Sequence, residues 1–402
     1  MTFPSEAVRD ELSRTLGVPI FQEQVMHLAM VAAGFTPGEA DQLRRAMAAW
    51  KRRGGLGPFE ERLKSGMRER GYTKQFAQQI FRQIEGFGEY GFPESHAASF
   101  ALLVYVSAWL KCHEPAVFTC ALINSQPMGF YAPSQLVQDA KRHGVAVRSV
   151  DVLRSDWGCT LEQGDDAKPA IRLGLRLVKG ISEAGCERLI ISRGKQRFRD
   201  VQDLATRARL ERGDLDALAA AGALRTLTGN RHRARWDVAG VEAPLPLMPQ
   251  IEIREGVPML RRPTEGEDVI ADYQSTGLTL GRHPMAFVRD RLDGQQICTA
   301  AGLWELPDGA TVSTAGLVIT RQRPGTAKGV TFVTLEDETG HVNLIVWERI
   351  AERQRRVLLG SRLLSVRGQL QKQGDVLHVI ARSLQDQSHL LGTLPAGSRN
   401  FR

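Results

Sequence analysis

Three groups of acidic residues have the close spacing that could hold a pair of metal ions for phosphoryl-transfer chemistry. They are Asp214 with Asp216, Glu336 with Asp337 and Glu338, and Asp165 with Asp166. The first pair falls in a helical pattern, where residues two apart point to different sides. The second group lies at an expected hairpin turn, and the third lies in a polar loop. We therefore expect no catalytic metal site from these groups.

A predicted helix over residues 37–53 carries a cluster of cations with no acidic residue between them. Thr36 and Glu39 form a capping box at its start, with proline at the first helical position. The cluster consists of Arg44, Arg45, Lys51, Arg52 and Arg53. Its last three members lie in the last turn, where cations also offset the negative end of the helix dipole. Phosphate contact and dipole capping therefore both remain as interpretations.

Residues 86–102 interleave glycines with aromatic residues and run directly into another predicted helix. Pro93 and Ser95 are start signals for that helix. Apolar and small residues then recur at the three-and-four spacing of one buried face: Phe100, Leu103, Val104, Ser107 and Leu110. His96 lies in the first turn, where its simplest role is that of a capping or packing histidine.

Residues 90–100, YGFPESHAASF, and residues 110–115, LKCHEP, are similar to the fingers domain of the bacterial DNA polymerase III alpha-subunit family. Residues 124–131, NSQPMGFY, and the Pro-Glu-Ser-His form of the first motif resemble the error-prone branch of that family, which acts in damage-induced synthesis. The resemblance runs from about Gly17 to Arg402 and corresponds to only the last two-fifths of the family. It implies that residues 1–126 are the C-terminal part of the polymerase fingers.

The resemblance also implies nucleotide-binding residues. Residues 43–47, LRRAM, match a fingers segment whose arginines face the triphosphate of the incoming nucleotide, so Arg44 and Arg45 are the first candidates. Lys51 and His96 are added to them, although the family usually continues with glycine and several lysines where this chain has Ala48 and its neighbours. No segment matches the palm domain, whose aspartates would hold Mg²⁺. We therefore expect no cofactor in this chain and Mg²⁺ only together with a palm.

Residues 171–182 have the pattern of a helix-hairpin-helix, with Gly180 in a small turn and Ser182 able to cap the next helix. Such a hairpin presents backbone N–H groups that can hold a DNA phosphate without reading sequence. A second unit follows near residues 215–224, and cations beside Trp236 come after it. The DNA-binding candidates here are Lys179, Gly180, Ser182, Arg231, Arg233 and Arg235. The plainer interpretation is an ordinary helix pair that turns on a glycine.

From residue 310 onward the apolar residues alternate with a period of two, which predicts strands. Three strands, a helix and two more strands in about seventy residues fit an OB-fold, a small barrel that often binds single-stranded nucleic acid. Arg321, Arg323 and Lys328 lie in its first loop and are the candidates for DNA contact. A purely structural barrel remains as the alternative, because exposed aromatic residues for base stacking are not obvious.

The predicted fold class is multidomain α+β, with mostly helical fingers and a tandem helix-hairpin-helix followed by a small all-β OB-fold barrel. The expected domains are the fingers part (1–126), a connector with a strand at 145–152 (127–168), the hairpin domain (169–236), a linker (237–300), and the barrel with its tail (301–402). The net charge of +8 favours a polyanionic partner. The five scattered cysteines form neither a metal-binding pattern nor a disulfide framework.

The sequence therefore predicts the DNA- and nucleotide-binding portion of an error-prone DNA-directed DNA polymerase that is inactive as this chain alone. Its expected partners are primer-template DNA and dNTP, with a separate palm-containing chain, a sliding clamp or mutasome accessory proteins as further candidates. The alternative is a non-catalytic DNA-binding protein that retains the hairpin and OB modules. No apolar run is long enough for a membrane span, and no signal-peptide order is present, so a cytoplasmic location is expected.

Overall fold

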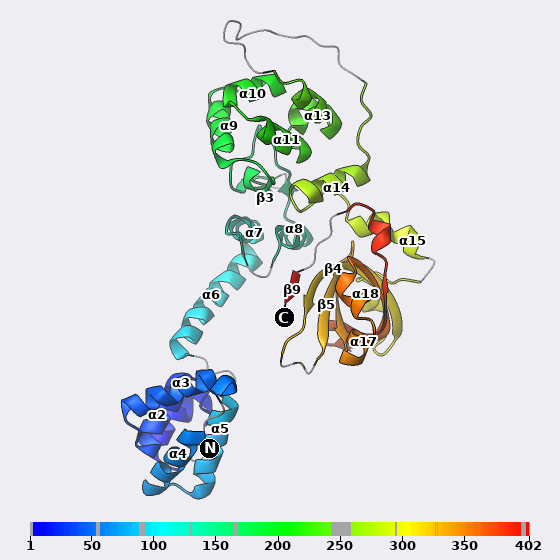
Figure 1. Cartoon of the computed structure of the whole chain (residues 1–402). Coiled ribbons are helices and arrows are strands. Elements are labelled where there is room, and N and C mark those ends of the chain that lie inside the picture. Colours follow the sequence, from blue (N-terminus) through cyan, green and yellow to red (C-terminus); the bar gives the residue numbers. More distant parts are fainter. Residues whose placement is uncertain are drawn as a thin grey trace. The chain divides into compact units, whose positions relative to one another are not determined.

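The computed structural model describes residues 3–53, 57–87, 93–128, 131–164, 168–242, 259–293, 296–325, 327, 329–394 and 399–401. The chain divides into two compact units, Met1–His113 and Glu114–Arg402, which are considered separately. The first unit is helical, and the second combines a helical region with a β-barrel (Figure 1). The predicted α+β fold class is confirmed.

Short helices surround the core of the first unit, and local sequence signals set their ends. The helices are α1 (Glu6–Leu12), α2 (Gln22–Ala33), α3 (Pro37–Arg53), α4 (Gly57–Glu69) and α5 (Lys74–Phe87), with the 3₁₀ turn η1 (Ser13–Thr15) after α1. Gly34 ends α2 in the left-handed conformation at φ 67°. The predicted capping box is present, because the Glu39 carboxylate accepts from the Thr36 amide at 2.7 Å and the Thr36 hydroxyl accepts from the Glu39 amide at 3.2 Å.

The helix α6 (Glu94–His113) forms where the sequence predicts it, but the prediction of a buried face is wrong. None of its residues is buried, and Phe100, Leu103 and Val104 are 47%, 59% and 63% exposed. The spacing of apolar residues indicates which of them share a face, whereas burial also requires a partner surface. Within the described ranges, no helix is both long enough and apolar enough to cross a membrane.

The second unit begins with two helices and a small sheet. Its elements are α7 (Pro115–Asn124), α8 (Pro133–Arg142), β1 (Val147–Arg148), β2 (Thr160–Gln163) and β3 (Pro169–Arg172). The strand order is β1-β3-β2, with β1 parallel and β2 antiparallel to β3. The strand expected at 145–152 is reduced to two residues, because Asp151 starts a turn in which its carboxylate accepts from the Leu153 amide at 2.9 Å. Helix α7 belongs to this unit, although the expected fingers part extends to residue 126.

The hairpin region packs short helices around one apolar core that it shares with α7, α8 and the small sheet. Its elements are η2 (Leu175–Leu177), α9 (Glu183–Lys195), α10 (Val201–Ala208), α11 (Arg212–Ala220), α12 (Arg225–Thr228) and α13 (Arg231–Ala239). A further helix, α14 (Glu265–Ser275), contacts α11. Leu175, Leu189, Leu204 and Leu218 are completely buried in this core, which fixes the relative positions of the two hairpins.

The C-terminal region is a closed barrel in the predicted order of three strands, a helical segment and two strands. Its elements are β4 (Thr311–Gln322), β5 (Thr331–Glu336), β6 (His341–Val346), α17 (Glu348–Arg353), α18 (Arg355–Gly360), β7 (Leu363–Gln373) and β8 (Val376–Asp386). Pairing of β4 with β5 closes the order β5-β6-β8-β7-β4, as in an OB-fold. Gly368 allows the close approach of β7 to β8, since a Cβ there would lie 2.3 Å from the Ile380 carbonyl oxygen.

Shorter elements surround the barrel. They are η3 (Pro284–Phe287), α15 (Arg289–Asp293), α16 (Gly302–Glu305), η4 (Ser388–Leu391) and β9 (Arg399–Phe401), which pairs in parallel with β4. Sequence periodicity did not indicate β9, because a three-residue strand is too short to show alternation.

Candidate nucleic-acid interface

The first hairpin turns at Gly180 and leads into α9. Gly180 has φ +83°, a conformation that favours glycine, and the space beside its Cα is open. Ser182 is the N-cap of α9, and its hydroxyl accepts from the Gly185 amide at 3.0 Å. In the described part of the chain, no hydrogen bond occupies the amides of Gly180, Glu183 and Ala184. These amides are the donors that the hairpin can offer to a phosphate.

A carboxylate from the neighbouring helix takes the remaining donors of this turn. Asp214 of α11, which is only 5% exposed, accepts the Ser182 amide at 2.8 Å through Oδ1 and the Ser182 hydroxyl at 2.8 Å through Oδ2. Asp214 also helps to raise the pKa of the Cys186 thiol to about 12, mainly because that thiol is buried. Ser182 is exposed, but its amide and hydroxyl are both hydrogen-bonded to Asp214. Asp214 thus joins the two hairpins rather than serving a metal site.

Lys179 points back toward helix α14. Its Nζ donates to the carbonyls of Tyr273 at 3.1 Å and Gln274 at 2.9 Å, and its backbone N–H donates to the Ser275 carbonyl at 2.8 Å. A lysine at this position donates hydrogen bonds to the last carbonyls of α14. Its positive charge also interacts favourably with the negative end of the dipole of that helix. Its side chain is exposed, but its ammonium group already has acceptors.

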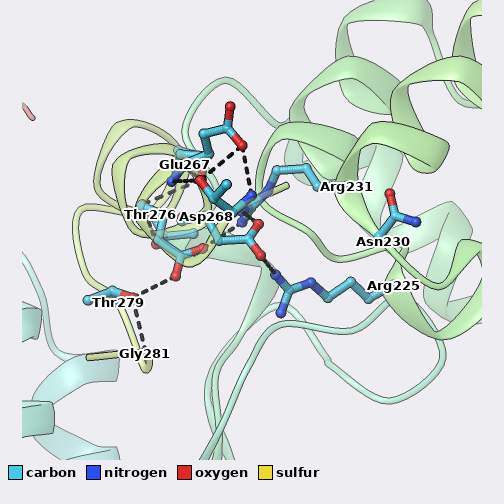
Figure 2. Close-up of polar contacts among 12 residues, drawn as sticks. Arg225, Asn230, Arg231, Glu267, Asp268, Thr276, Thr279 and Gly281 are labelled. Atoms are coloured by element: carbon cyan, nitrogen blue, oxygen red, sulfur yellow. Dashed lines mark hydrogen bonds and ion pairs between the residues drawn. The ribbon is translucent and has the colours of Figure 1, made fainter. Parts of the chain in front are cut away.

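Arg231 is buried between α13 and α14 and does not face solvent. Its side chain is 3% exposed, and it pairs with Asp268 (Figure 2). It also pairs with Asp272 at 2.5 Å. Arg225 pairs with the same Asp268 at 2.5 Å, and the Thr279 hydroxyl donates to Asp272 at 2.7 Å. These contacts attach α14 to the hairpin region. The structure therefore gives Arg231 a structural position and does not favour it as a DNA contact.

The other two arginines of α13 differ in accessibility. Arg233 is half-buried, and its Nε lies 2.6 Å from Asp237, one turn along the same helix. Arg235 is exposed, and no ion pair engages it within the described residues. Trp236 beside it is 47% exposed. Arg235 and Trp236 are thus a cation and an aromatic ring that α13 presents to solvent.

The predicted cations of the barrel also separate into buried and exposed ones. Arg321 is 4% exposed, and its guanidinium group donates to the carbonyls of Leu358, at 2.5 Å, and Ser361. Burial lowers the pKa of Arg321 below its usual value. Arg323 is half-exposed and pairs with Glu348 at 3.3 Å, so it could exchange this partner for a phosphate. Lys328 lies outside the described residues.

The outer surface of the barrel carries exposed apolar residues that are not among the predicted DNA contacts. Phe332 on β5 is 39% exposed and lies opposite Ile345 on β6, which in turn lies opposite Ile380 on β8. Trp347, directly after β6, is 54% exposed. The alternation of β5 contained the signal, since Thr331 and Val333 are buried and Phe332 therefore stands on the outward face. Exposed rings of this kind can stack on unpaired bases.

The candidate nucleotide-binding residues lie in the first unit. Arg44 and Arg45 both pair with Asp41, each at 2.8 Å, and the hydrogen bond from Arg44 holds the pKa of Asp41 below its usual value. Arg45 is 74% exposed. His96 is exposed in the first turn of α6, with its ring edge-on to Phe100 at 4.5 Å. The side chain of Lys51 lies outside the described residues.

The remaining acidic groups are engaged with basic side chains. Asp337 and Glu338 pair with Arg289 at 3.2 and 2.7 Å, and Asp216 lies 3.4 Å from Arg212. Asp165 and Asp166 lie outside the described residues. In the part of the chain that the structure describes, no group of His, Cys, Asp and Glu side chains is arranged to hold a metal ion. Whether the chain binds Mg²⁺ only together with a palm domain stays a prediction.

Three family models match separate parts of the chain. The model "Bacterial DNA polymerase III alpha subunit finger domain" matches residues 1–71, "Helix-hairpin-helix motif" matches residues 144–234, and "OB-fold nucleic acid binding domain" matches residues 312–386. An error-prone DNA polymerase of Alkalilimnicola ehrlichii is 63% identical over 399 residues, covering 99% of this chain and 39% of the relative. The chain belongs to the bacterial DNA polymerase III alpha-subunit family, in its error-prone branch.

Other error-prone DNA polymerases agree with this assignment. That of Methylococcus capsulatus is 59% identical over 420 residues, and that of Pseudomonas fluorescens Pf-5 is 56% identical over 412 residues. Each match covers 100% of this chain and 40% of the relative. This member of the polymerase III family therefore spans about two-fifths of the length of the curated relatives that it matches.

In this polymerase III family chain, some predicted contact residues are accessible to a ligand, whereas others are engaged by groups of the protein itself. Gly180, Arg235 and Arg323 are accessible, and Arg45 and His96 are accessible in the first unit. Four others connect elements of their own unit, namely Lys179, Ser182, Arg231 and Arg321. Arg233 pairs with Asp237 within its own helix. Sequence patterns could not make this separation, because the partners Asp214, Asp268 and Asp272 are 32 to 41 residues away.

Proposed function

We propose that this chain is the part of an error-prone DNA polymerase that holds primer-template DNA and the incoming nucleotide, while a palm domain outside this chain supplies Mg²⁺ and the catalytic carboxylates. One observation carries the proposal: the chain matches error-prone DNA polymerases along its whole length, at 63% identity over 399 residues. The alternative, a non-catalytic DNA-binding protein that retains the hairpin and OB modules, has no comparable support.

The duplex is held through its backbone. The amides of Glu183 and Ala184 lie in the first turn of the 13-residue helix α9, and that of Gly180 lies in the turn before it, where the helix dipole also favours an anion. Arg235 adds a charge that pairs with a phosphate, and Trp236 beside it adds an exposed ring. This set of groups recognises the phosphate backbone, so binding is expected to be independent of base sequence.

The single-stranded template contacts the barrel. Phe332 and Trp347 offer exposed rings, and Arg323 can neutralise a phosphate after it releases Glu348. Arg45, with His96, is assigned to the triphosphate of the nucleotide, because a guanidinium group can pair bidentately with phosphate oxygens. Asp41 holds Arg44 and Arg45 in place until an anion replaces it.

A primer-extension assay tests this proposal. The purified chain, with primer-template, dNTPs and Mg²⁺, should bind the DNA and extend no primer, because metal-bound carboxylates contribute stabilisation of the transition state that positioning residues do not. Mixing with the unmatched part of the Alkalilimnicola ehrlichii polymerase should restore extension, and Arg45→Ala should then raise the nucleotide KM. Extension by the chain alone, after removal of contaminating polymerases, would show that a catalytic centre has been overlooked.

A further inference from the structure

Helix α6 is apolar on every side. Leu102, Leu103, Val104, Tyr105 and Val106 are consecutive, and each is at least 47% exposed. Successive helical residues point about 100° apart, so five of them cover the whole circumference. Trp109, one turn further, is 49% exposed. An ordinary surface helix of a soluble protein has one apolar stripe and one polar face, whereas a helix that is apolar all round is typical of the core of a larger protein.

The start of α6 is fixed to the rest of its unit. The Glu94 amide donates to Glu23 at 2.8 Å, and the Glu94 carboxylate pairs with Arg14 at 2.9 Å. The N-terminal end of the helix therefore has a defined position within the first unit. The helix thus presents a contiguous apolar surface from a fixed starting point, and an exposed apolar surface of this extent marks an interaction site.

We propose that α6 is a central helix of a fold that is completed by the part of an error-prone DNA polymerase lying outside the matched two-fifths, and that this part packs around it. The proposal rests on the proposed function, because the relatives that match this chain carry about three-fifths of their length beyond it. A second copy of the chain is a poorer occupant. A twofold pair of α6 helices would cover one stripe on each helix and leave the opposite side exposed.

The test uses the full 402-residue chain and the part of the Alkalilimnicola ehrlichii error-prone polymerase outside the matched region. Size-exclusion chromatography with light scattering should show a 1:1 complex, and titration calorimetry should give its affinity. Leu102→Glu and Val104→Glu place a charge on sides of α6 about 200° apart. Each should weaken the complex at least thirtyfold. The matched control is Ile191→Glu on α9, because Ile191 is equally apolar and 62% exposed. It should leave the affinity unchanged.

The outcomes are distinct. Weakening by both variants supports the proposal, whereas weakening by only one would mean a partner on one side and would overturn it. Self-association of the chain, flotation with phosphatidylglycerol vesicles, or a complex indifferent to both variants would also overturn it. The exposed positions of Leu102 and Val104 predict unchanged thermal unfolding of the variants alone. Duplex binding by the same variants separates the two proposals: its absence, with an intact α6-dependent complex, would refute the proposed function and leave this inference standing.

Discussion

The Asp214 carboxylate accepts both the backbone N–H and the hydroxyl of Ser182, at 2.8 Å each, across 32 residues of sequence. This contact joins the N-terminus of α9 to the first turn of α11. It also places a negative charge beside the amides that are free to hold a phosphate. The Asp214 carboxylate therefore holds the two hairpins together in the absence of DNA.

Replacement of Asp214 by alanine should destabilise the second unit by about 3 kcal/mol, because two hydrogen bonds to a buried charged acceptor are lost. Thermal or urea unfolding, followed by circular dichroism, measures this. Asp216→Ala is the matched control, since the Asp216 side chain is 60% exposed beside Arg212 and its removal should change stability little. Equal losses of stability from the two substitutions would show that the contact between Asp214 and Ser182 does not stabilise the fold.

Arg231 and Arg235 lie one helical turn apart on α13 and should behave in opposite ways. Arg235→Gln should weaken duplex binding and lower the salt slope of the affinity by about 1, without a change in stability, because one phosphate contact is lost. Arg231→Gln should lower stability by about 3–5 kcal/mol, because it leaves Asp268 and Asp272 without their buried partner. Unfolding curves and fluorescence anisotropy on labelled duplex distinguish the two effects. Loss of DNA affinity by a fully folded Arg231 variant would reverse this assignment.

Phe332→Ala should weaken binding to a single-stranded template overhang by about 1–3 kcal/mol while leaving blunt-duplex affinity unchanged, because one base loses its stacking partner. Leu359→Ala on α18 is a control of similar exposure, since Leu359 is 53% exposed and carries no ring. Anisotropy with an overhang and with a blunt duplex makes the comparison. A barrel that serves only as a structural module would show no difference between the two variants.

Acid should weaken the small sheet through Glu162, which pairs with Arg172 at 2.9 Å and Arg148 at 2.8 Å. The hydrogen bond from Arg172 acts against burial and lowers the pKa of Glu162 to about 2. Because the folded-state pKa lies below the unfolded one, the ion pairs stabilise the fold fully above about pH 4.5 and progressively less as the pH falls to about 2. The loss should reach at most about 3 kcal/mol.

Urea unfolding at several pH values between 2 and 7 tests this dependence. Glu162→Gln should lower stability at neutral pH and flatten the curve below pH 4.5. The exposed Glu187 on α9 supplies the control variant Glu187→Gln, which should keep the wild-type pH dependence. A Glu162→Gln curve parallel to that of the wild type would contradict the assignment.

Local signals predicted much of the fold. The capping box of Thr36 and Glu39, the turn glycine at position 34 and the alternation of β4 to β8 each act over a few residues, and each appears where the sequence indicates it. Phe332 was missed even though the same alternation assigns it to the outward face.

What the sequence could not predict depends on distant partners. The sequence does not distinguish the roles of Arg231 and Arg235. Only the contacts of Arg231 with Asp268 and Asp272 do so. Similarly, the apolar spacing of α6 predicts a buried face, but no periodicity shows whether the surface that covers it is available. Both cases are set by tertiary contacts rather than by local preference.

The salt dependence of duplex binding by the full chain tests the central claim most directly. Fluorescence anisotropy on two duplexes of unrelated sequence should give equal affinities that fall steeply with salt, because the hairpin binds phosphates and releases counterions. With Arg235, Arg323 and some of the other exposed cations in contact, the slope of log K against log salt should lie between about −2 and −4. A flat salt dependence, or a strong preference for one sequence, would contradict backbone binding by this chain.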